Sequence, residues 1–115
     1  MKLNHINLAV PDVPSMAAFL ETYFEMRNGG GNAGFTVLYD DEGLVLSLMK
    51  AGRSWGDGYP GSFHIGFYLP TRERVDQVYQ SLTAGGLVVD KPGDTGHSYG
   101  FYVTAPGGVQ VEVGA

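Results

Sequence analysis

Alternation of apolar and polar residues marks four strands in this chain. In each strand the aliphatic side chains fall on one face, and a polar residue occupies a fixed place on the other. The polar residues concerned are His5, Ser47, His64 and Glu112. Because the phase recurs in all four strands, we expect the aliphatic faces to pack on helices and these four residues to lie on the opposite faces.

Helical periodicity separates the strands at two places. The first predicted helix begins near Asp12, which can cap it, with Pro14 in the first turn, where a missing N–H costs no hydrogen bond. The second follows Thr71 and ends at Gly85-Gly86. The apolar stripes are Met16, Ala17, Leu20 and Phe24 in the first helix and Val75, Val78, Tyr79 and Leu82 in the second.

The remaining segments predict further strands and turns. Strands are expected at 35–39 and 99–104, with a shorter one around 87–90. Residues 40–43 and 106–108 are typical of hairpin turns. The glycine-rich run 27–32 has no strand pattern, so the first half is predicted to lack a clear second strand there.

The two halves of the chain repeat one order of elements. Both open with His-Ile, at His5 and His64, reach a proline after similar spacing and lead into a helical pattern. Both close on a glycine followed by an alternating strand, at 43–48 and 108–113. Aligning these glycines places Ser47 opposite Glu112, so the repeat brings together three residues of metal-ligand type and one serine.

Composition excludes several classes of protein. A chain of 115 residues suits one domain with a modest core. Its net charge of −5 argues against nucleic acid as a partner. No apolar run approaches the roughly 20 residues that cross a membrane, and the N-terminus lacks a signal pattern. The absence of cysteine excludes disulfide and thiolate chemistry and fits a cytoplasmic protein.

Taken together, these motifs resemble the vicinal oxygen chelate superfamily, also called the glyoxalase/bleomycin-resistance/dioxygenase fold. The marks are the opening strand with His5, the exit Val10-Pro11-Asp12 into a helix, and the second opening with His64. The ending Ala-Pro-Gly-Gly-Val-Gln-Val-Glu at 105–112 is similar to the family's Asp-Pro-x-Gly-x-x-x-Glu. The resemblance covers essentially the whole chain.

The resemblance implies an α+β fold in which two βαβββ modules form a cupped mixed sheet. We expect a single domain, 1–115, with a first module at 1–51, a linker at 52–61 and a second module at 62–115. Members with one pair of modules are usually homodimers, so we expect a homodimer. The implied metal ligands are His5, His64 and Glu112.

Two neutral imidazoles and one carboxylate suit Fe(II), Mn(II), Ni(II), Co(II) or Zn(II) and leave coordination positions open. A small substrate can then chelate the metal through two neighbouring oxygens, and the metal acts as a Lewis acid. The favoured function is therefore a lyase, dioxygenase or transferase of this superfamily, with Glu112 also a catalytic candidate.

This sequence differs from each of three subfamilies at a functional position or in length, so the type of reaction stays open. Lactoylglutathione lyases carry a glutamate at the position of Ser47, and a serine hydroxyl is a poor ligand and base. Extradiol dioxygenases usually have four modules. Fosfomycin-resistance thiol transferases use a His/His/Glu site but need a cationic pocket, for which seven Lys and Arg residues are sparse and Arg53 is one candidate.

Five further residues have two interpretations each. His97 is either a general base at the edge of the cup or an exposed loop residue. Ser47 either hydrogen-bonds the substrate or lines the pocket. Tyr68 and Tyr102 either orient a substrate oxygen or fill space. Trp55 either closes over an aromatic ligand or packs at a dimer seam.

The competing function is a metal-free protein that sequesters a drug or metabolite, as bleomycin-resistance members do. A buried, unpaired carboxylate at Glu112 would be costly, so this residue needs a cation or a hydrogen-bond donor beside it. Binding-only members generally lose the ligand set, whereas this chain keeps three of the four positions. That retention favours the enzyme.

Overall fold

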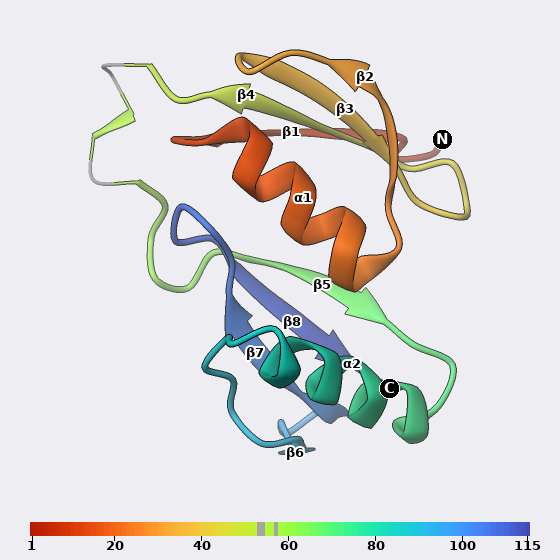
Figure 1. Ribbon diagram of the computed structural model, residues 1–115. Coiled ribbons are helices and arrows are strands. Elements are labelled where there is room, and N and C mark those ends of the chain that lie inside the picture. The colour runs from red at the N-terminus through yellow and green to blue at the C-terminus, as the bar shows by residue number, and fades with distance from the viewer. Residues whose placement is uncertain (53–54, 57) are drawn as a thin grey trace. The chain divides into compact units, whose positions relative to one another are not determined.

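The computed structural model describes residues 1–52, 55–56 and 58–115. The chain forms two compact units, Met1–Gly58 and Tyr59–Ala115, and their division falls inside the segment expected to be a linker. Each unit consists of one sheet and one helix (Figure 1). Arg53, the candidate for a phosphonate contact, lies outside the described residues.

The first unit contains β1 (His5–Val10), α1 (Val13–Phe24), β2 (Arg27–Gly31), β3 (Phe35–Tyr39) and β4 (Val45–Lys50). Its sheet has the order β1-β4-β3-β2. The β1–β4 pair is parallel, which the long connection through α1, β2 and β3 allows, and the other pairs are antiparallel.

The second unit repeats this plan with β5 (His64–Tyr68), α2 (Arg72–Ala84), β6 (Gly93–Asp94), β7 (Tyr99–Thr104) and β8 (Gln110–Gly114). The order is β5-β8-β7-β6, with β5–β8 parallel and the other pairs antiparallel. The predicted α+β fold of two βαβββ modules is confirmed. Neither α1 nor α2, the helices of the described residues, is long and apolar enough to span a membrane.

Both helices begin where the sequence places their caps. Asp12 accepts hydrogen bonds from the amide of Ser15 at 3.1 Å and from its hydroxyl at 2.7 Å. These two bonds lower the pKa of the Asp12 carboxyl. Thr71 accepts a bond from the amide of Arg74 at 3.2 Å. At the other end, α2 stops at Gly85, and Gly86 adopts a positive φ of 86°.

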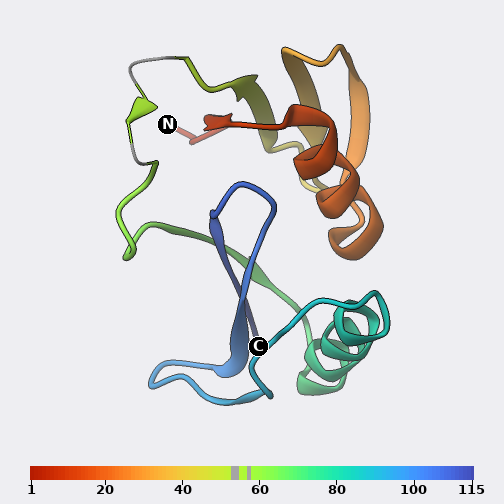
Figure 2. The ribbon, with the colours of Figure 1, turned by 60° about the vertical axis from the view of Figure 1, so that its left-hand side comes forward.

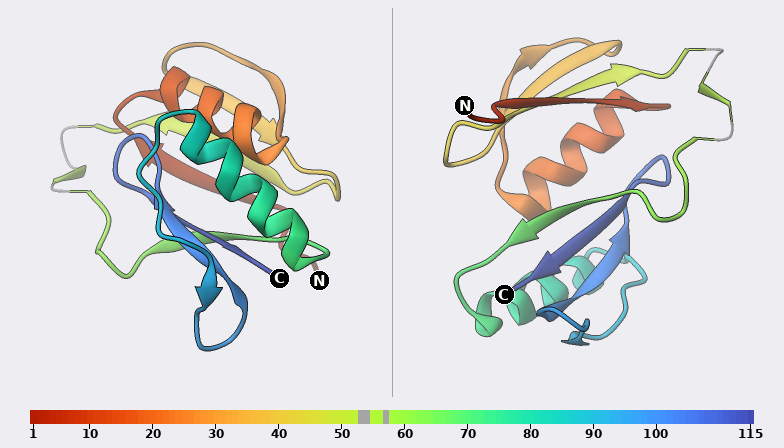
Figure 3. Two further views of the ribbon diagram at one scale, coloured as in Figure 1. Left: turned by 60° about the horizontal axis from the view of Figure 1, so that its bottom comes forward. Right: turned by 180° about the vertical axis from the view of Figure 1, so that it is seen from behind.

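Each sheet buries its aliphatic face against the helix of its own unit (Figure 2). Seen from behind in Figure 3, β1 and β5 lie in front of α1 and α2, respectively, so the opposite face of each sheet is free of its helix. The helical residues that are buried are Val13, Met16, Ala17, Phe19 and Leu20 in α1 and Val75, Val78 and Leu82 in α2. Phe24 and Tyr79 complete the predicted stripes but are only half-buried.

The prediction that the first half lacks a second strand is wrong, because Arg27–Gly31 forms β2. This strand is exposed throughout and is held by backbone pairing with β3, so it has no apolar alternation to reveal it. Its glycines have a structural reason. A side chain at Gly29 would collide with the ring of Tyr39, and Gly31 has a φ of 150° beside the Phe35 carbonyl.

The short strand expected around 87–90 is also wrong. This segment has no regular structure, and the side chain of Val88 is 97% exposed, so its β-branched residues do not enter the sheet. The edge strand is instead β6, where Gly93 pairs with Gly100 and Asp94 with Tyr99. The β-strand propensity of these residues predicted a strand, but no neighbouring strand in the described part of the chain pairs with this segment.

Candidate functional site

Glu112 lies on the face of the second sheet that α2 does not cover. The parallel register sets Gly66 of β5 beside it, and the antiparallel register sets Tyr102 of β7 on its other side. His64 precedes Gly66 by two residues and therefore shares this face. The nearest atoms to a side chain added at Gly66 would belong to Glu112, at 3.9 Å, so the glycine leaves one flank of the carboxylate open.

Both carboxylate oxygens of Glu112 contact an imidazole. The residue is only 8% exposed. Nε2 of His97 donates to Oε1 at 2.7 Å, and Nε2 of His64 lies 3.3 Å from Oε2. The buried carboxylate thus has a hydrogen-bond donor in His97, as its burial requires, and the His64 imidazole beside it.

Local structure places each imidazole. Nδ1 of His64 lies 3.1 Å from the carbonyl oxygen of Ser62, which turns Nε2 toward Glu112. His97 stands on a turn closed by a bond from the Thr95 amide to the Ser98 carbonyl at 2.9 Å. Gly96, with a φ of 97°, allows this turn, and its amide donates to Asp94 at 2.8 Å.

Tyr102 adds a neutral hydrogen-bond donor to the cluster. Burial raises the pKa of Tyr102, and the charge of Glu112 and a hydrogen bond to that carboxylate raise it further. Its ring meets the imidazole of His64 edge-on, with centroids 5.9 Å apart. Tyr68 is exposed on the same face and also contributes to the raised pKa of Tyr102. Tyr102 therefore keeps its proton at neutral pH.

In the first unit, the same register position carries a different pair. Asn7 faces Ser47 across β1–β4, as Gly66 faces Glu112 across β5–β8, so the predicted correspondence of Ser47 with Glu112 is confirmed. The buried Ser47 hydroxyl donates to Oδ1 of Asn7 at 2.7 Å. Nδ1 of His5 contacts Oδ1 of Asn4 at 2.7 Å, and its ring is exposed. Asn7 was not among the predicted site residues, although alternation already placed it on the face of His5.

The predicted site residues therefore divide between the two units. His64, His97 and Tyr102 gather around Glu112, and Tyr68 lies on the same sheet face. His5, Ser47 and Trp55 belong to the first unit. Trp55 is half-buried, and its amide donates to the Gly52 carbonyl at 3.1 Å.

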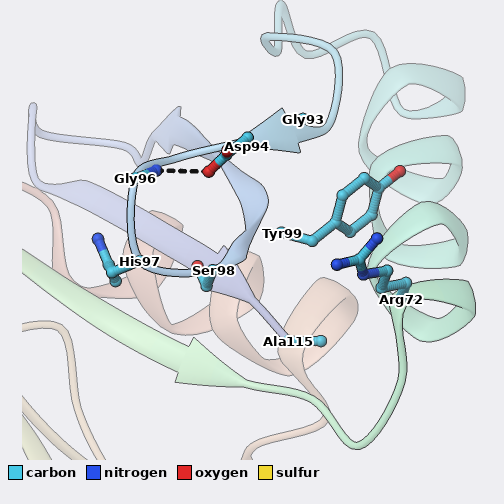
Figure 4. Close-up of a pocket in the computed structure, with 8 residues that line it drawn as sticks. All are labelled: Arg72, Gly93, Asp94, Gly96, His97, Ser98, Tyr99 and Ala115. Atoms are coloured by element: carbon cyan, nitrogen blue, oxygen red, sulfur yellow. Dashed lines mark hydrogen bonds between the residues drawn. The ribbon is translucent and has the colours of Figure 1, made fainter.

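A pocket of about 600 Å³ adjoins the turn that carries His97 (Figure 4). The guanidinium of Arg72 lies 5.2 Å from the ring centre of Tyr99, so Arg72 has an aromatic partner rather than water alone. The Tyr99 hydroxyl donates to Asp76 at 2.6 Å, and this hydrogen bond raises the pKa of Tyr99. The other lining residues are Gly93, Asp94, Gly96, His97, Ser98 and Ala115.

The side chains around Glu112 provide two of the ligand atoms that a divalent metal needs. Within the described residues, no three His, Cys, Asp or Glu side chains are already arranged to hold an ion. The 3.3 Å between Nε2 of His64 and Oε2 of Glu112 suits two ligands of one ion, since bonds of about 2.1 Å would then meet at about 100°. The pair fits a metal in chemistry and separation, and the remaining ligand must come from elsewhere.

The family model described as Glyoxalase/Bleomycin resistance protein/Dioxygenase superfamily matches residues 2–113. The chain belongs to this superfamily. A similar solved structure is that of a possible glyoxalase from Bacillus cereus, 39% identical, with a TM-score of 0.90 and coverage of 100% of this chain and 99% of that one.

Two further superfamily structures share the fold at lower identity. Lactoylglutathione lyase from Agrobacterium tumefaciens is 21% identical over 98% of this chain and 92% of its own, with a TM-score of 0.78. A mutant of the fosfomycin resistance protein FosX from Listeria monocytogenes, complexed with Mn(II) and 1S,2S-dihydroxypropylphosphonic acid, is 20% identical. That match covers 99% of this chain and 91% of FosX, with a TM-score of 0.81.

Proposed function

We propose that the chain is a divalent-metal enzyme that acts on a small, oxygen-chelating substrate. The observation that carries this proposal is the buried Glu112 carboxylate, whose Oε2 lies 3.3 Å from Nε2 of His64. His64 and Glu112 would supply two ligands and His5 a third. The Mn(II) complex of FosX, a structural relative, supports a divalent ion.

The residues around the ion would bind and orient the substrate. When bound, the metal would act as a Lewis acid toward the substrate oxygens. Tyr102, kept neutral by burial and by Glu112, would redirect its single O–H from that carboxylate to one of these oxygens. Tyr68, exposed on the same face, would offer a second hydroxyl, and Ser47 and Trp55 are proposed to contact substrate from the first unit.

Proton transfer is assigned to the two groups that can accept a proton next to the substrate. Glu112 is one of them, through whichever oxygen the ion leaves available. His97 is the other, and it would accept the proton at Nδ1, because its Nε2 already donates to Glu112. We propose that the reaction is that of a lyase, dioxygenase or transferase. We also propose that the protein works as a cytoplasmic homodimer.

One observation favours a second candidate function, metal-free binding of a drug or metabolite. Two imidazoles already lie against the carboxylate oxygens of Glu112, and that of His97 donates a hydrogen bond, so the buried carboxylate has a polar partner without a cation. The open face of the second sheet, with Tyr68 and Tyr102, would then contact an organic ligand directly.

Elemental analysis of tag-free protein separates the two functions. The wild type is compared with His64→Ala and Glu112→Gln, and Thr104→Ala, on the same strand as Tyr102, serves as the control. If the protein is a metal enzyme, we expect near-stoichiometric metal in the wild type and in the control, and loss of metal in both site variants. If the wild type takes up no Fe(II), Mn(II), Ni(II), Co(II) or Zn(II) on reconstitution, metal-free sequestration replaces the enzyme.

A further inference from the structure

The two oxygens of Glu112 have different surroundings, and this difference assigns a role to His97. The His97 contact at Oε1, 2.7 Å, is a short charge-assisted hydrogen bond. The His64 contact at Oε2, 3.3 Å, is long for such a bond and has the spacing of two ligands of one ion. Of these two oxygens, Oε2 is therefore the better placed to bind a metal.

Two features fix the position of His97: the closed turn that carries it, and the glycine of β8 against which this turn packs. Thr95 bonds to Ser98 through its amide at 2.9 Å and through its hydroxyl at 3.0 Å, which closes the turn. The turn packs directly on β8, because a side chain at Gly114 would approach the Ser98 hydroxyl to 2.8 Å. Gly114 thus lets the turn lie close enough for His97 to reach Glu112.

We infer that His97 is a positioning residue, which holds Oε1 of Glu112 by a hydrogen bond and thereby presents Oε2 to the metal beside His64. This inference rests on the proposed metal function and adds that His97 itself is not a ligand. Hydrogen bonds to a ligating carboxylate fix its orientation, and their loss lowers metal affinity by about 10- to 100-fold. Without His97, Oε1 would lose its short hydrogen bond and compete for the ion, while the hydrogen bond from Tyr102 to the carboxylate would remain.

The test compares Zn(II) affinity among the wild type, His97→Leu and His97→Gln by competition with a chromophoric chelator. Leucine cannot donate to Oε1, whereas the glutamine amide can. We expect affinity to fall about 10- to 100-fold in His97→Leu and to recover largely in His97→Gln. Circular dichroism shows that both variants are folded, and the visible spectrum of bound Co(II) should change in the leucine variant and return in the glutamine variant.

Imidazole NMR then distinguishes a positioning residue from a ligand. The chain has three histidines and no cysteine, so each ring can be assigned by single substitutions. On addition of Zn(II), Nε2 of His64 should shift as a metal-bound nitrogen, while Nε2 of His97 should keep its proton.

Four results overturn the inference. Equal affinity and equal Co(II) spectra in the wild type and His97→Leu, or a metal-bound shift at His97, would contradict it while leaving the metal function intact. Tighter binding by His97→Leu would make His97 a competitor of the metal. A wild type that binds neither Zn(II) nor Co(II) would remove the metal function and the inference together.

Discussion

The Ser47 hydroxyl donates a 2.7 Å hydrogen bond to Oδ1 of Asn7 at the register position where the second unit sets Glu112 beside Gly66. The first unit therefore has a satisfied hydroxyl–amide pair at this position rather than a carboxylate. Because Oδ1 of Asn7 accepts this bond, the amide nitrogen is the group left to donate to a ligand. Asn7 is thus a better candidate than Ser47 for direct contact with substrate in the first unit.

Ser47→Ala tests the strength of this pair. The substitution leaves Oδ1 of Asn7 without its donor, so the free energy of unfolding should fall by about 1 kcal/mol. Urea denaturation measures the change. Ser81→Ala, at an exposed position of α2, is the matched control and should not destabilise the protein, because alanine is the better helix former. An equal loss in both variants would show that the Ser47 bond contributes nothing.

Gly66→Ala tests whether the open flank of Glu112 matters. An added methyl group would lie 3.9 Å from Oε2, an ordinary contact, and Gly66 has no positive φ to strain. Stability should rise by about 0.5 kcal/mol, since alanine restricts the unfolded chain more than glycine does. Zn(II) affinity should nevertheless fall, because the methyl group narrows access to Oε2.

Gly61→Ala is the control for this pair of measurements, since a side chain at Gly61 would meet no atom within 4 Å. Chelator competition should give it the affinity of the wild type. A Gly66→Ala protein that also binds Zn(II) as the wild type does would argue against metal entry on this flank.

Tyr99→Phe should give a stability difference that depends on pH. The hydrogen bond to Asp76 raises the pKa of Tyr99 above its ordinary value of 10.0, so the folded state favours the neutral phenol. The resulting stabilisation is fully present below pH 10 and is lost as pH rises through the folded-state pKa. Urea midpoints of the wild type and Tyr99→Phe should therefore differ at pH 8 and converge above pH 10. A constant difference across this range would contradict the assignment.

Thr71→Ala should destabilise the second unit. The substitution removes the cap of α2, whose oxygen accepts from the Arg74 amide at 3.2 Å, at a cost of about 1 kcal/mol. Thr83→Ala is the matched control in the last turn, where the hydroxyl only bonds back to the Tyr79 carbonyl at 3.1 Å and the Gln80 carbonyl at 3.0 Å. The control should be neutral or slightly stabilising in thermal unfolding. Equal destabilisation of the two variants would refute the cap assignment.

Local chemistry explains which parts of the fold were predictable. Asp12 and Thr71 predict the starts of their helices, because a cap needs only a side-chain oxygen and an amide three residues away. β3 and β7 were predicted with their observed bounds because their apolar residues alternate or cluster. β2 was missed because Gly29 makes room for the ring of Tyr39 and Gly31 for the Phe35 carbonyl, so the strand carries no apolar pattern in the sequence.

The sequence by itself determined the repeated modules, the helix caps and the sheet face on which His64 and Glu112 lie, because alternation and capping depend on neighbours in the chain. Only the tertiary structure decided that His97, 15 residues before Glu112, takes one carboxylate oxygen while His64 approaches the other. It also decided that Ser47 is bound to Asn7. The physical reason is that a hydrogen bond requires two atoms within about 3 Å, and only strand register and turn geometry set such distances between remote residues.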